Sequence, residues 1–303
     1  YYMYNPILLN IDYESMMQNP SLYKDKGDLF IKEFCFEAKK REIRVMMDLV
    51  INHTSVDSEL LEKNPDWYEK NEDGTIKNPG ALDGDNWIVW GDLAQIDNEN
   101  SSDKANLWKY WLDYILHYAE LGIRGFRCDA AYQVPSSLWE YLIKEVKKVY
   151  PDAVFLAETL SCAPDKIIDI IDSGFDIVMN SFKWWDFNAE WFLKDYNQWV
   201  EKGSSMTFPE NHDTERFAAE YDNDSKKAVC YYAIEAYFCS SIAITIGFEY
   251  GFKKKIEVTK TSPSDYEEIN YDIVEEIRMI NEIKEKYDIF KEDNFIEIYN
   301  FNN

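Results

Sequence analysis

Three short segments of this 303-residue chain place polar side chains directly after or within apolar runs. DLVINH ends in Asn52 and His53, and AVFLAET carries Glu158 after five apolar residues. GIRGFRCDA spaces Arg127 and Asp129 two residues apart, so a strand would turn both side chains to one face. An arginine placed in this way keeps the neighbouring carboxylate ionised, as a nucleophile requires. A purely structural ion pair, and for His53 a hydrogen-bonded histidine at a strand end, are the alternatives.

A carboxyl that emerges from apolar surroundings is easily protonated, so the setting of Glu158 suits a general acid. An exposed glutamate at a strand end would give the same pattern. A fourth segment, FPENHDTERF, gathers the polar residues Asn211, His212, Asp213 and Arg216. Such a cluster can contact a ligand, or it can form turns in which Asx side chains bond the backbone.

Taken together, the four segments pair one ionised carboxylate with one that is easily protonated. Glycoside hydrolysis needs this pair, the first as nucleophile and the second as acid and then base. In parallel α/β barrels the active site lies at the carboxyl ends of the strands, where every βα loop opens. The pattern therefore predicts sugar chemistry at that edge of a parallel sheet.

The elements that would position these residues follow an alternating order. Short runs rich in β-branched residues alternate with segments of helical period, which predicts βα units, a parallel sheet and the α/β class. Six strands are predicted, at residues 43–51, 123–129, 153–158, 175–180, 204–211 and 241–247.

Three helices have recognisable limits. One is predicted between Asp103 and Gly122, because apolar residues recur there at helical spacing. A second is predicted to start at Ser137, whose hydroxyl fits a capping box with Glu140. A third pattern covers residues 266–287.

The segment 54–100 interrupts the alternation. It holds DGTIKNPGALDGD, is rich in turn-forming residues and is too long for a βα loop, so an inserted subdomain is expected. Residues 1–53 and 101–288 would then form the barrel. Residues 289–303, which end in the alternating FIEIYNFNN, are expected to start a C-terminal β domain that the chain cuts short.

Composition excludes several classes of function. With 57 Asp and Glu against 32 Lys and Arg, the net charge of −25 repels phosphate backbones and anionic lipid surfaces, so nucleic acid is not an expected partner. No apolar stretch approaches the roughly 20 residues of a membrane span. Five scattered cysteines suggest free thiols and favour a cytoplasmic location, although the chain lacks an initiator methionine.

At the four segments the sequence resembles the α-amylase superfamily, glycoside hydrolase family thirteen. That family is identified by four conserved segments in fixed order, and DLVINH, GFRCD, the glutamate of FLAET and ENHD are similar to all four. The resemblance implies that Asp129 is the nucleophile and Glu158 the general acid/base. It also implies that Asp213 stabilises the distorted sugar and the oxocarbenium-like transition state.

The resemblance also implies contacts with the nucleophile or the sugar. The predicted substrate-binding residues are His53, Arg127, His212, Asp48, Tyr132 and Arg216. Many amylases carry a Lys-His pair shortly after the nucleophile, whereas this chain has Ala131, Tyr132 and Gln133, which leaves acceptor preference open. The aromatic segment SFKWWDFNAEWF could provide stacking platforms for sugar rings, or core packing.

The fold implied by the resemblance is a (β/α)8 TIM-type barrel with a domain B after the third strand. The six predicted strands would be strands three to eight, so the chain is expected to lack the N-terminal part of the barrel. Asn52 matches the family's usual calcium ligand, and Asp97 or Asp92 could complete an oxygen-rich site. A plain turn with Asx hydrogen bonds fits equally, and no other cofactor is expected.

These inferences predict a retaining glycoside hydrolase that acts on α-glucans or malto-oligosaccharides. A glucosyl- or maltosyl-transferase is the alternative, because both reactions share the covalent intermediate. The third possible function is that of a non-catalytic amylase-like protein or an inactive fragment. The complete set of Asp129, Glu158 and Asp213 argues against it, and the absent strands argue for it. The sequence does not disclose the oligomeric state.

Overall fold

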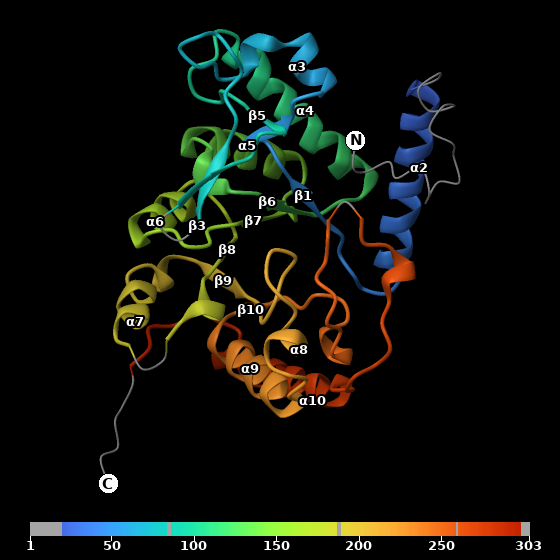
Figure 1. Ribbon diagram of the computed structural model, residues 1–303, viewed down its shortest axis with the longest axis vertical. Coiled ribbons are helices and arrows are strands. Elements are labelled where there is room, and N and C mark those ends of the chain that lie inside the picture. The colour runs from blue at the N-terminus through green and yellow to red at the C-terminus, as the bar shows by residue number, and fades with distance from the viewer. Residues whose placement is uncertain (1–19, 84–85, 187–188, 259, 298–303) are drawn as a thin grey trace. The chain divides into compact units, whose positions relative to one another are not determined.

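The computed structural model describes residues 20–83, 86–186, 189–258 and 260–297 (Figure 1). The chain divides into two compact units. The first comprises residues up to 158 together with 173–175, and the second comprises 159–172 and the residues from 176 onward. Each unit combines parallel strands with helices, which confirms the α/β class.

The first unit contains helices, strands and short 3-10 helices in alternating order. In chain order they are α2 (Pro20–Lys39), β1 (Met46–Leu49), β2 (His53–Ser55), α3 (Glu59–Lys63), η1 (Pro65–Trp67), β3 (Gly80–Asp83), β4 (Asn86–Val89), β5 (Leu93–Gln95), α4 (Lys104–Leu121), β6 (Gly125–Cys128), η2 (Ala131–Gln133), α5 (Ser136–Val149) and β7 (Val154–Ala157).

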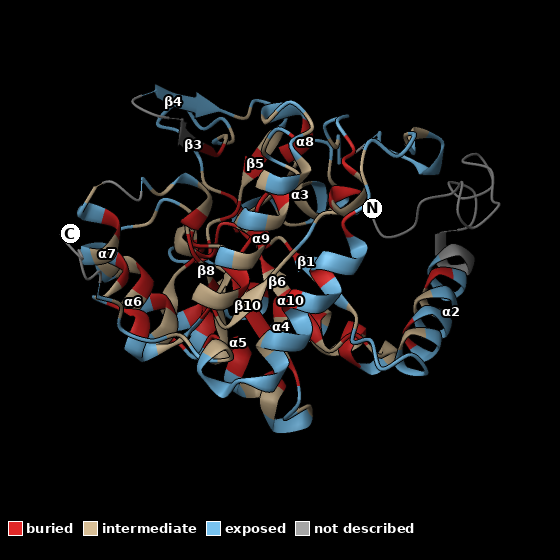
Figure 2. Ribbon diagram, turned by 90° about the horizontal axis from the view of Figure 1, so that it is seen from below, coloured by how far each residue is buried: buried red, intermediate tan, exposed pale blue. Residues whose placement is uncertain are grey.

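The strands β1, β6 and β7 form the parallel sheet of this unit. Met47 pairs with Phe126, and Phe126 pairs with Phe155. Phe126 and Phe155 are fully buried, and their rings stack with centroids 5.3 Å apart. Helices α4 and α5 pack together, and each buries one apolar face. Helix α2 is exposed over most of its length, as its pale blue colour in Figure 2 shows.

The segment after β1 forms two small antiparallel sheets. β2 pairs with β5, so that His53 lies opposite Gln95, and β3 pairs with β4. Strand β4 carries the exposed Trp87, Ile88 and Val89. The segment therefore has secondary structure of its own, as an insertion would, while its assignment as a separate domain stays a prediction.

The second unit alternates in the same way. In chain order its elements are α6 (Pro164–Asp172), β8 (Ile177–Met179), η3 (Phe182–Trp184), α7 (Trp191–Tyr196), η4 (Val200–Lys202), β9 (Ser204–Thr207), α8 (Phe217–Glu220), α9 (Ser225–Phe238), β10 (Ser241–Ile242), η5 (Phe248–Tyr250), η6 (Pro263–Asp265), α10 (Val274–Lys286) and η7 (Asp288–Phe290).

Strands β8, β9 and β10 are parallel neighbours, and a core of aromatic and aliphatic side chains lies under α8, α9 and α10. Phe217, Tyr232 and Phe248 are buried in this core. The Tyr232 hydroxyl on α9 bonds Asn281 on α10 at 2.8 Å. Lys284 of α10 donates to the carbonyls of Ala236 and Cys239, which closes the C-terminal end of α9.

Several predicted limits of elements were wrong. The strand predicted at 204–211 ends at Thr207, because Pro209 has no N–H to donate to a ladder. The strand predicted at 241–247 is restricted to Ser241–Ile242, and the chain turns further on at Gly247, whose φ is +92°. The predicted helix over 266–287 begins only at Val274.

The capping box predicted at Ser137 is also wrong. Helix α5 begins at Ser136, its N-cap is Pro135, and no side chain caps it. By contrast, Gly122 ends α4 in the left-handed conformation that the sequence suggested.

The closing segment contains no strand as far as residue 297, and residues 298–303 of FIEIYNFNN lie outside the described residues. Asp293 instead ties this segment to the unit by accepting hydrogen bonds from Tyr196 and Ser205. The C-terminal β domain stays a prediction.

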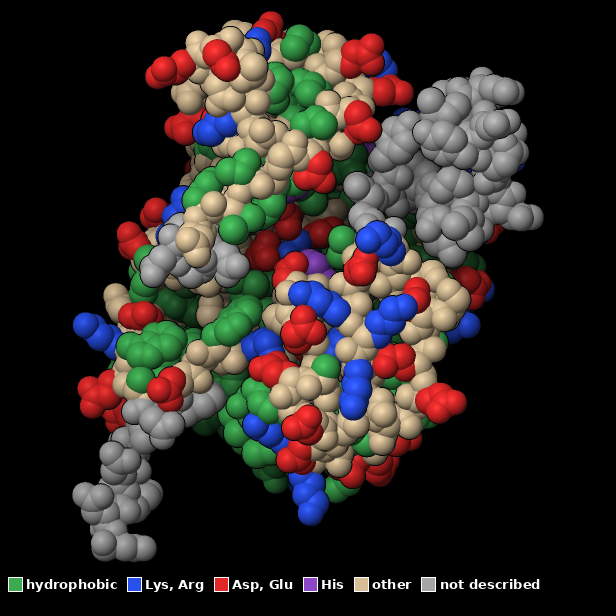
Figure 3. Space-filling view, viewed as in Figure 1, with side chains coloured by type: hydrophobic (Ala, Val, Ile, Leu, Met, Phe, Trp, Pro, Cys, Tyr) green, Lys and Arg blue, Asp and Glu red, His purple; other side chains and the backbone are tan. Residues whose placement is uncertain are grey.

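All five cysteines are free thiols, as their scattered positions indicated. Among the described helices, none combines the length and hydropathy needed to cross a bilayer. Acidic side chains are spread widely over the face drawn in Figure 3, in keeping with the net charge of −25.

Candidate active site

In the first unit, the side chain of Arg127 is the centre of a carboxylate cluster. Its strand β6 lies beside β1, where Asp48 is its register partner, and beside β7, which ends one residue before Glu158. The Nη1 atom lies 2.8 Å from Asp48 Oδ1 and 2.7 Å from Asp129 Oδ1, and Nη2 lies 2.9 Å from Glu158 Oε1. Three carboxylates from three adjacent strands or strand ends thus meet one guanidinium.

The electrostatics of this cluster favour a permanent positive charge at its centre. Burial alone would lower the pKa of Arg127, but Glu158, Asp48 and Asp129 together raise it above its usual value. The arginine side chain is only 12% exposed. It is therefore fixed in position, and it offers hydrogen bonds to the two carboxylates whose roles the sequence predicts.

The structure corrects the expected surroundings of Glu158. The five apolar residues before it suggested an apolar pocket, but Arg127 contacts one oxygen of the carboxylate. The N–H of Ala130 donates to the other oxygen at 2.8 Å. The run VFLA before Glu158 is buried in the sheet, and the strand ends where the side chain reaches the polar edge. The strand pattern predicted the position of the Glu158 carboxylate at the end of the strand, but it did not predict the polar groups around it.

Ala130 is a residue that the sequence analysis missed. Its φ of +40° is in the left-handed region, which residues with a Cβ seldom adopt. This conformation turns the chain after Asp129 and directs the Ala130 N–H at Glu158. Backbone strain of this kind tends to occur at functional sites. An alanine directly after the candidate nucleophile gives no signal in a single sequence.

His53 lies in the same unit, at the start of β2. Burial lowers the pKa of its imidazole, while the charges of Asp129 and Asp92 oppose that shift. Its Nδ1 has no hydrogen-bond partner among the described residues. Burial therefore favours the neutral imidazole, and the Nδ1 atom is itself shielded from solvent.

The predicted calcium ligands give a divided result. Asn52 is 4% exposed, and neither its amide oxygen nor its amide nitrogen has a partner among the described residues. Buried polar groups are usually hydrogen-bonded, so this side chain is unusual. Asp97, by contrast, accepts the N–H of Asn100 at 2.7 Å, as in an Asx turn. In the described parts of the chain no group of three or more His, Cys, Asp and Glu could hold a metal.

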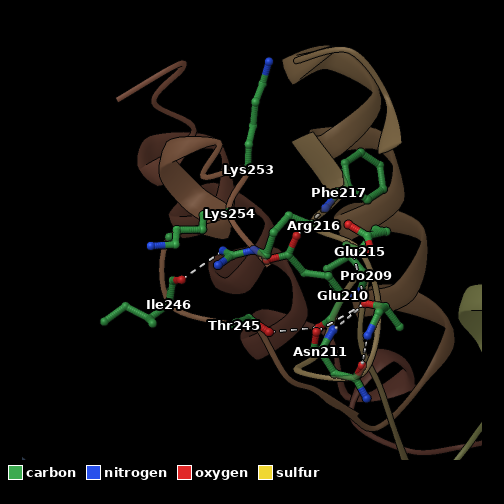
Figure 4. A network of polar contacts seen from close by, with 12 residues as sticks. Pro209, Glu210, Asn211, Glu215, Arg216, Phe217, Thr245, Ile246, Lys253 and Lys254 are labelled. Atoms are coloured by element: carbon green, nitrogen blue, oxygen red, sulfur yellow. Dashed lines mark hydrogen bonds and ion pairs between the residues drawn. The ribbon is translucent and has the colours of Figure 1, made fainter. Parts of the chain in front are cut away.

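In the second unit, the fourth segment folds around a buried ion pair. Arg216 Nε lies 2.7 Å from Glu210 Oε1, and these side chains are 2% and 1% exposed. Arg216 also donates to the Ile246 carbonyl, and Glu210 accepts the N–H of Phe217 (Figure 4). Burial raises the pKa of Glu210, and the charge of Arg216 opposes this.

This arrangement changes the interpretation of Arg216, which the sequence placed among the substrate contacts. A guanidinium that is 2% exposed and bound to Glu210 and Ile246 holds the segment in shape and does not face solvent. Glu210 is its counterpart, and the sequence analysis overlooked it. The one available signal was a glutamate six residues before an arginine within a polar segment.

The ion pair supports an exposed turn that presents Asp213. The Asn211 side chain accepts the N–H groups of Asp213 and Thr214 at 3.0 and 3.1 Å, which is the Asx alternative considered for this cluster. The carboxylate of Asp213 is 59% exposed and lies 3.3 Å from His212 Nε2. Asp213 and His212 are thus available to a ligand. Tyr132, the remaining predicted contact, lies in η2 directly after the Asp129 turn.

Comparisons with known proteins show that the chain is similar to enzymes named for sugar transfer. No family model matches the chain. It is 32% identical over 159 residues to the α-1,4-glucan:maltose-1-phosphate maltosyltransferase of Rhodospirillum rubrum, which is 51% of this chain and 21% of the relative. It is 21% identical over 184 residues to the enzyme of the same name from Burkholderia pseudomallei, covering 61% of this chain and 16% of the relative.

Solved structures show the same fold. An α-amylase from Lactobacillus plantarum superposes with a TM-score of 0.67 and 24% identity, covering 84% of this chain and 62% of the other. A maltogenic α-amylase from Thermotoga neapolitana does so with a TM-score of 0.67 and 22% identity, over 86% and 60%. The fold is that of the (β/α)8 α-amylases, as the sequence predicted. The chain spans about a fifth of the length of the curated relatives it matches.

Proposed function

We propose that this chain, which is similar in sequence to maltosyltransferases and has the fold of α-amylases, carries the machinery of a retaining enzyme that transfers glucosyl or maltosyl units between α-glucans. The observation that supports the chemistry most directly is the contact of one arginine, Arg127, with both Asp129 and Glu158. Retaining enzymes need their two carboxyl groups about 5–5.5 Å apart, and a shared guanidinium keeps them close.

In the first half-reaction, an Asp129 oxygen would attack the anomeric carbon while the bond to the leaving oxygen breaks. Glu158 would give its proton to that oxygen. A glycosyl ester of Asp129 results. Arg127 can orient the Asp129 carboxylate for this attack, whereas Glu158 must take up a proton and exchange its Arg127 contact for the leaving oxygen.

In the second half-reaction, an acceptor hydroxyl would attack the same carbon, Glu158 would take its proton, and the ester bond would break. We propose that Asp213 and the adjacent His212 bind hydroxyls of the sugar substrate. His53, whose imidazole burial favours in the neutral form, is also proposed to bond a sugar hydroxyl.

A sugar as acceptor, and not water, is the preferred proposal because the similar curated proteins are named maltosyltransferases. Hydrolysis uses the same residues with water in place of the sugar, and it is the second candidate. Incubation with an α-maltosyl fluoride and maltotetraose separates the two. A transferase yields chains two glucose units longer, whereas a hydrolase yields mainly maltose.

The covalent step has a direct test. We expect a 5-fluoro-α-glycosyl fluoride to add one glycosyl mass to the chain, and peptide mapping should place the adduct on Asp129. The matched control is Asp129→Asn, which should show no adduct. An adduct on another residue would contradict the assignment, and absence of any adduct would mean that this chain does not assemble the site.

We further propose that catalysis needs no cofactor, because side chains provide the nucleophile, the acid and the positive charge. Calcium would have a structural role at the buried Asn52, whose amide oxygen is of the type that the ion prefers. Thermal unfolding with calcium and with a chelator tests this proposal. A calcium-dependent rise in Tm that Asn52→Leu removes would support it, and equal Tm values would refute it.

A further inference from the structure

The turn that follows Asp129 holds the Glu158 carboxyl group through a backbone N–H. Ala130 donates to Glu158 Oε2 at 2.8 Å, while Arg127 contacts the other oxygen, Oε1, at 2.9 Å. In the proposed reaction Oε1 exchanges its Arg127 contact for the leaving oxygen. The Ala130 N–H can keep its bond to Oε2 meanwhile, because a carboxyl group retains an acceptor oxygen in either protonation state. The turn therefore sets the direction in which Glu158 presents its proton.

The direction of this N–H depends on a backbone conformation that is unfavourable by itself. Ala130 has φ +40° and ψ +47°, in the left-handed region, where the Cβ of an alanine is crowded. Such a conformation persists when the surrounding contacts determine it. The N–H of Gln133 donates to the Ala130 carbonyl at 2.8 Å, which closes the turn within the segment itself. A further contact comes from helix α5.

That contact is made by the indole of Trp139. Its Nε1 donates to the carbonyl of Ala131, the residue directly after Ala130, at 2.9 Å. The same carbonyl accepts the N–H of Val134 at 3.2 Å. Trp139 is 0% exposed, and its ring meets Phe175 edge to face with centroids 5.2 Å apart. The indole N–H is thus a fixed donor that ties the turn to the core of the first unit.

We propose that Trp139 is a positioning residue for the general acid. Through the Ala131 carbonyl it holds the turn in which Ala130 directs its N–H at Glu158, and so keeps Oε1 directed at the leaving oxygen. The role of Glu158 as the acid rests on the proposed function. The series of contacts from Trp139 to Glu158 rests on the geometry alone. A tryptophan that served only to fill the core would not need its N–H at this carbonyl.

Hydrogen exchange at the Ala130 amide tests the support of the turn. Trp139→Phe keeps an aromatic ring beside Phe175 but removes the N–H. With alanine labelled with ¹⁵N, the Ala130 amide should exchange at least about fivefold faster, because one hydrogen bond no longer holds the turn. The matched control is Trp111→Phe on α4, since Trp111 is 3% exposed and its Nε1 donates to Asn98 Oδ1 at 3.2 Å.

Trp111→Phe removes the same atoms from the core of the same unit, but it should leave exchange at Ala130 unchanged. Equal exchange in Trp139→Phe and the parent would overturn the proposal. Equal acceleration in the two variants would overturn it as well, because a general loosening of the core would then explain the result.

The dependence of turnover on the leaving group tests the link to Glu158. A sugar hydroxyl must be protonated as it leaves, whereas fluoride needs little help from an acid. Trp139→Phe should lower initial rates with maltotetraose about fivefold, and those with an α-maltosyl fluoride less than about twofold. The ratio of the two rates should stay at the parent value in Trp111→Phe. Equal losses with the two substrates in Trp139→Phe would overturn the proposed role, since they indicate a merely structural one.

The two measurements separate this inference from the proposed function. Exchange at Ala130 needs no activity, so it decides whether Trp139 supports the turn even if the chain turns over neither substrate. Faster exchange in Trp139→Phe alone, together with the change in the ratio of rates, supports the proposal. Turnover of both substrates with the parent ratio and the parent exchange rate would overturn the role of Trp139 and leave the proposed function standing.

Discussion

Two arginines of this protein meet carboxylates in opposite ways. Arg127 in the first unit is shared by three carboxylates, and the side chains of Asp129 and Glu158 remain 24% and 14% exposed. Arg216 in the second unit faces Glu210 alone, and both side chains are almost completely buried. The first arrangement holds groups that solvent or a ligand can reach. The second arrangement only stabilises the conformation of the segment around it.

The difference shows that ion pairs of the same chemical type can support either a catalysed reaction or the stability of the fold. A carboxylate that shares its arginine and remains partly exposed can give up that contact to a substrate. A fully buried pair cannot, because each separated charge would lose its counter-ion away from water. Substitutions in the first cluster should therefore mainly affect turnover, and those in the second should mainly affect unfolding.

The largest effect is expected at Asp129. Asp129→Asn should lower turnover by about 10³-fold or more, because an amide cannot form the glycosyl ester. The structure should survive, since Asn is isosteric and Arg127 retains Asp48 and Glu158 as partners. Initial rates with an α-maltosyl fluoride measure the loss, and circular dichroism measures the fold. Turnover close to that of the parent would end the assignment of Asp129 as nucleophile.

The next largest effect is a loss of stability on substitution of Arg216. Arg216→Met should lower the free energy of unfolding by about 3–5 kcal/mol, because it leaves Glu210 buried without its cation. Urea unfolding measures the change. The matched control is Arg278→Met on α10, whose arginine is 53% exposed and pairs with Glu275 and Glu282. That change should cost less than about 1 kcal/mol. Similar losses in the two variants would refute the contrast.

Glu235 on α9 tests what happens to a buried carboxyl without an arginine. It is 0% exposed, and neither oxygen has a hydrogen-bond partner among the described residues. Burial raises its pKa well above the ordinary value, and the charge of Lys183 only partly opposes this. Since the folded state retains the proton to higher pH than the unfolded state, stability should fall as pH rises above the unfolded pKa.

Glu235→Gln mimics the protonated form and removes this dependence. Its Tm should match that of the parent near pH 4 and exceed it increasingly towards pH 8. The matched control is Glu276→Gln on the exposed side of α10, which should follow the parent at every pH. A Glu235→Gln variant that is less stable than the parent at pH 8 would show that Glu235 has a partner as a charged group.

Much of the first cluster could be predicted from the sequence, because strand alternation is local. The two-residue spacing of Arg127 and Asp129 placed both at one edge of the sheet, and the contact between them is observed. The surroundings of Glu158 could not be predicted. They depend on the register of β6 and β7, which brings Arg127 and the Ala130 N–H to this carboxylate.

The second cluster was predicted less well, and the reason is physical. Glu210 and Arg216 lie in a polar segment, where nothing local distinguishes a buried charge from an exposed one. Contacts with residues distant in sequence surround them, because Arg216 donates to the Ile246 carbonyl and the adjacent Phe217 packs against Phe248. Trp184 and Trp185 are neighbours in the sequence, yet only the structure shows that Trp184 is the exposed one.

The smallest effect should come from Asp48, the most exposed member of the Arg127 cluster at 52%. Asp48→Asn should change the free energy of unfolding by less than about 1 kcal/mol, because water screens an exposed ion pair. Its effect on turnover should be much smaller than that of Asp129→Asn, since Arg127 retains its contacts with Asp129 and Glu158. Urea unfolding and initial rates measure the two quantities. A loss of stability comparable to that of Arg216→Met would mean that the Arg127 cluster also holds the fold, and the contrast between the two arginines would fail.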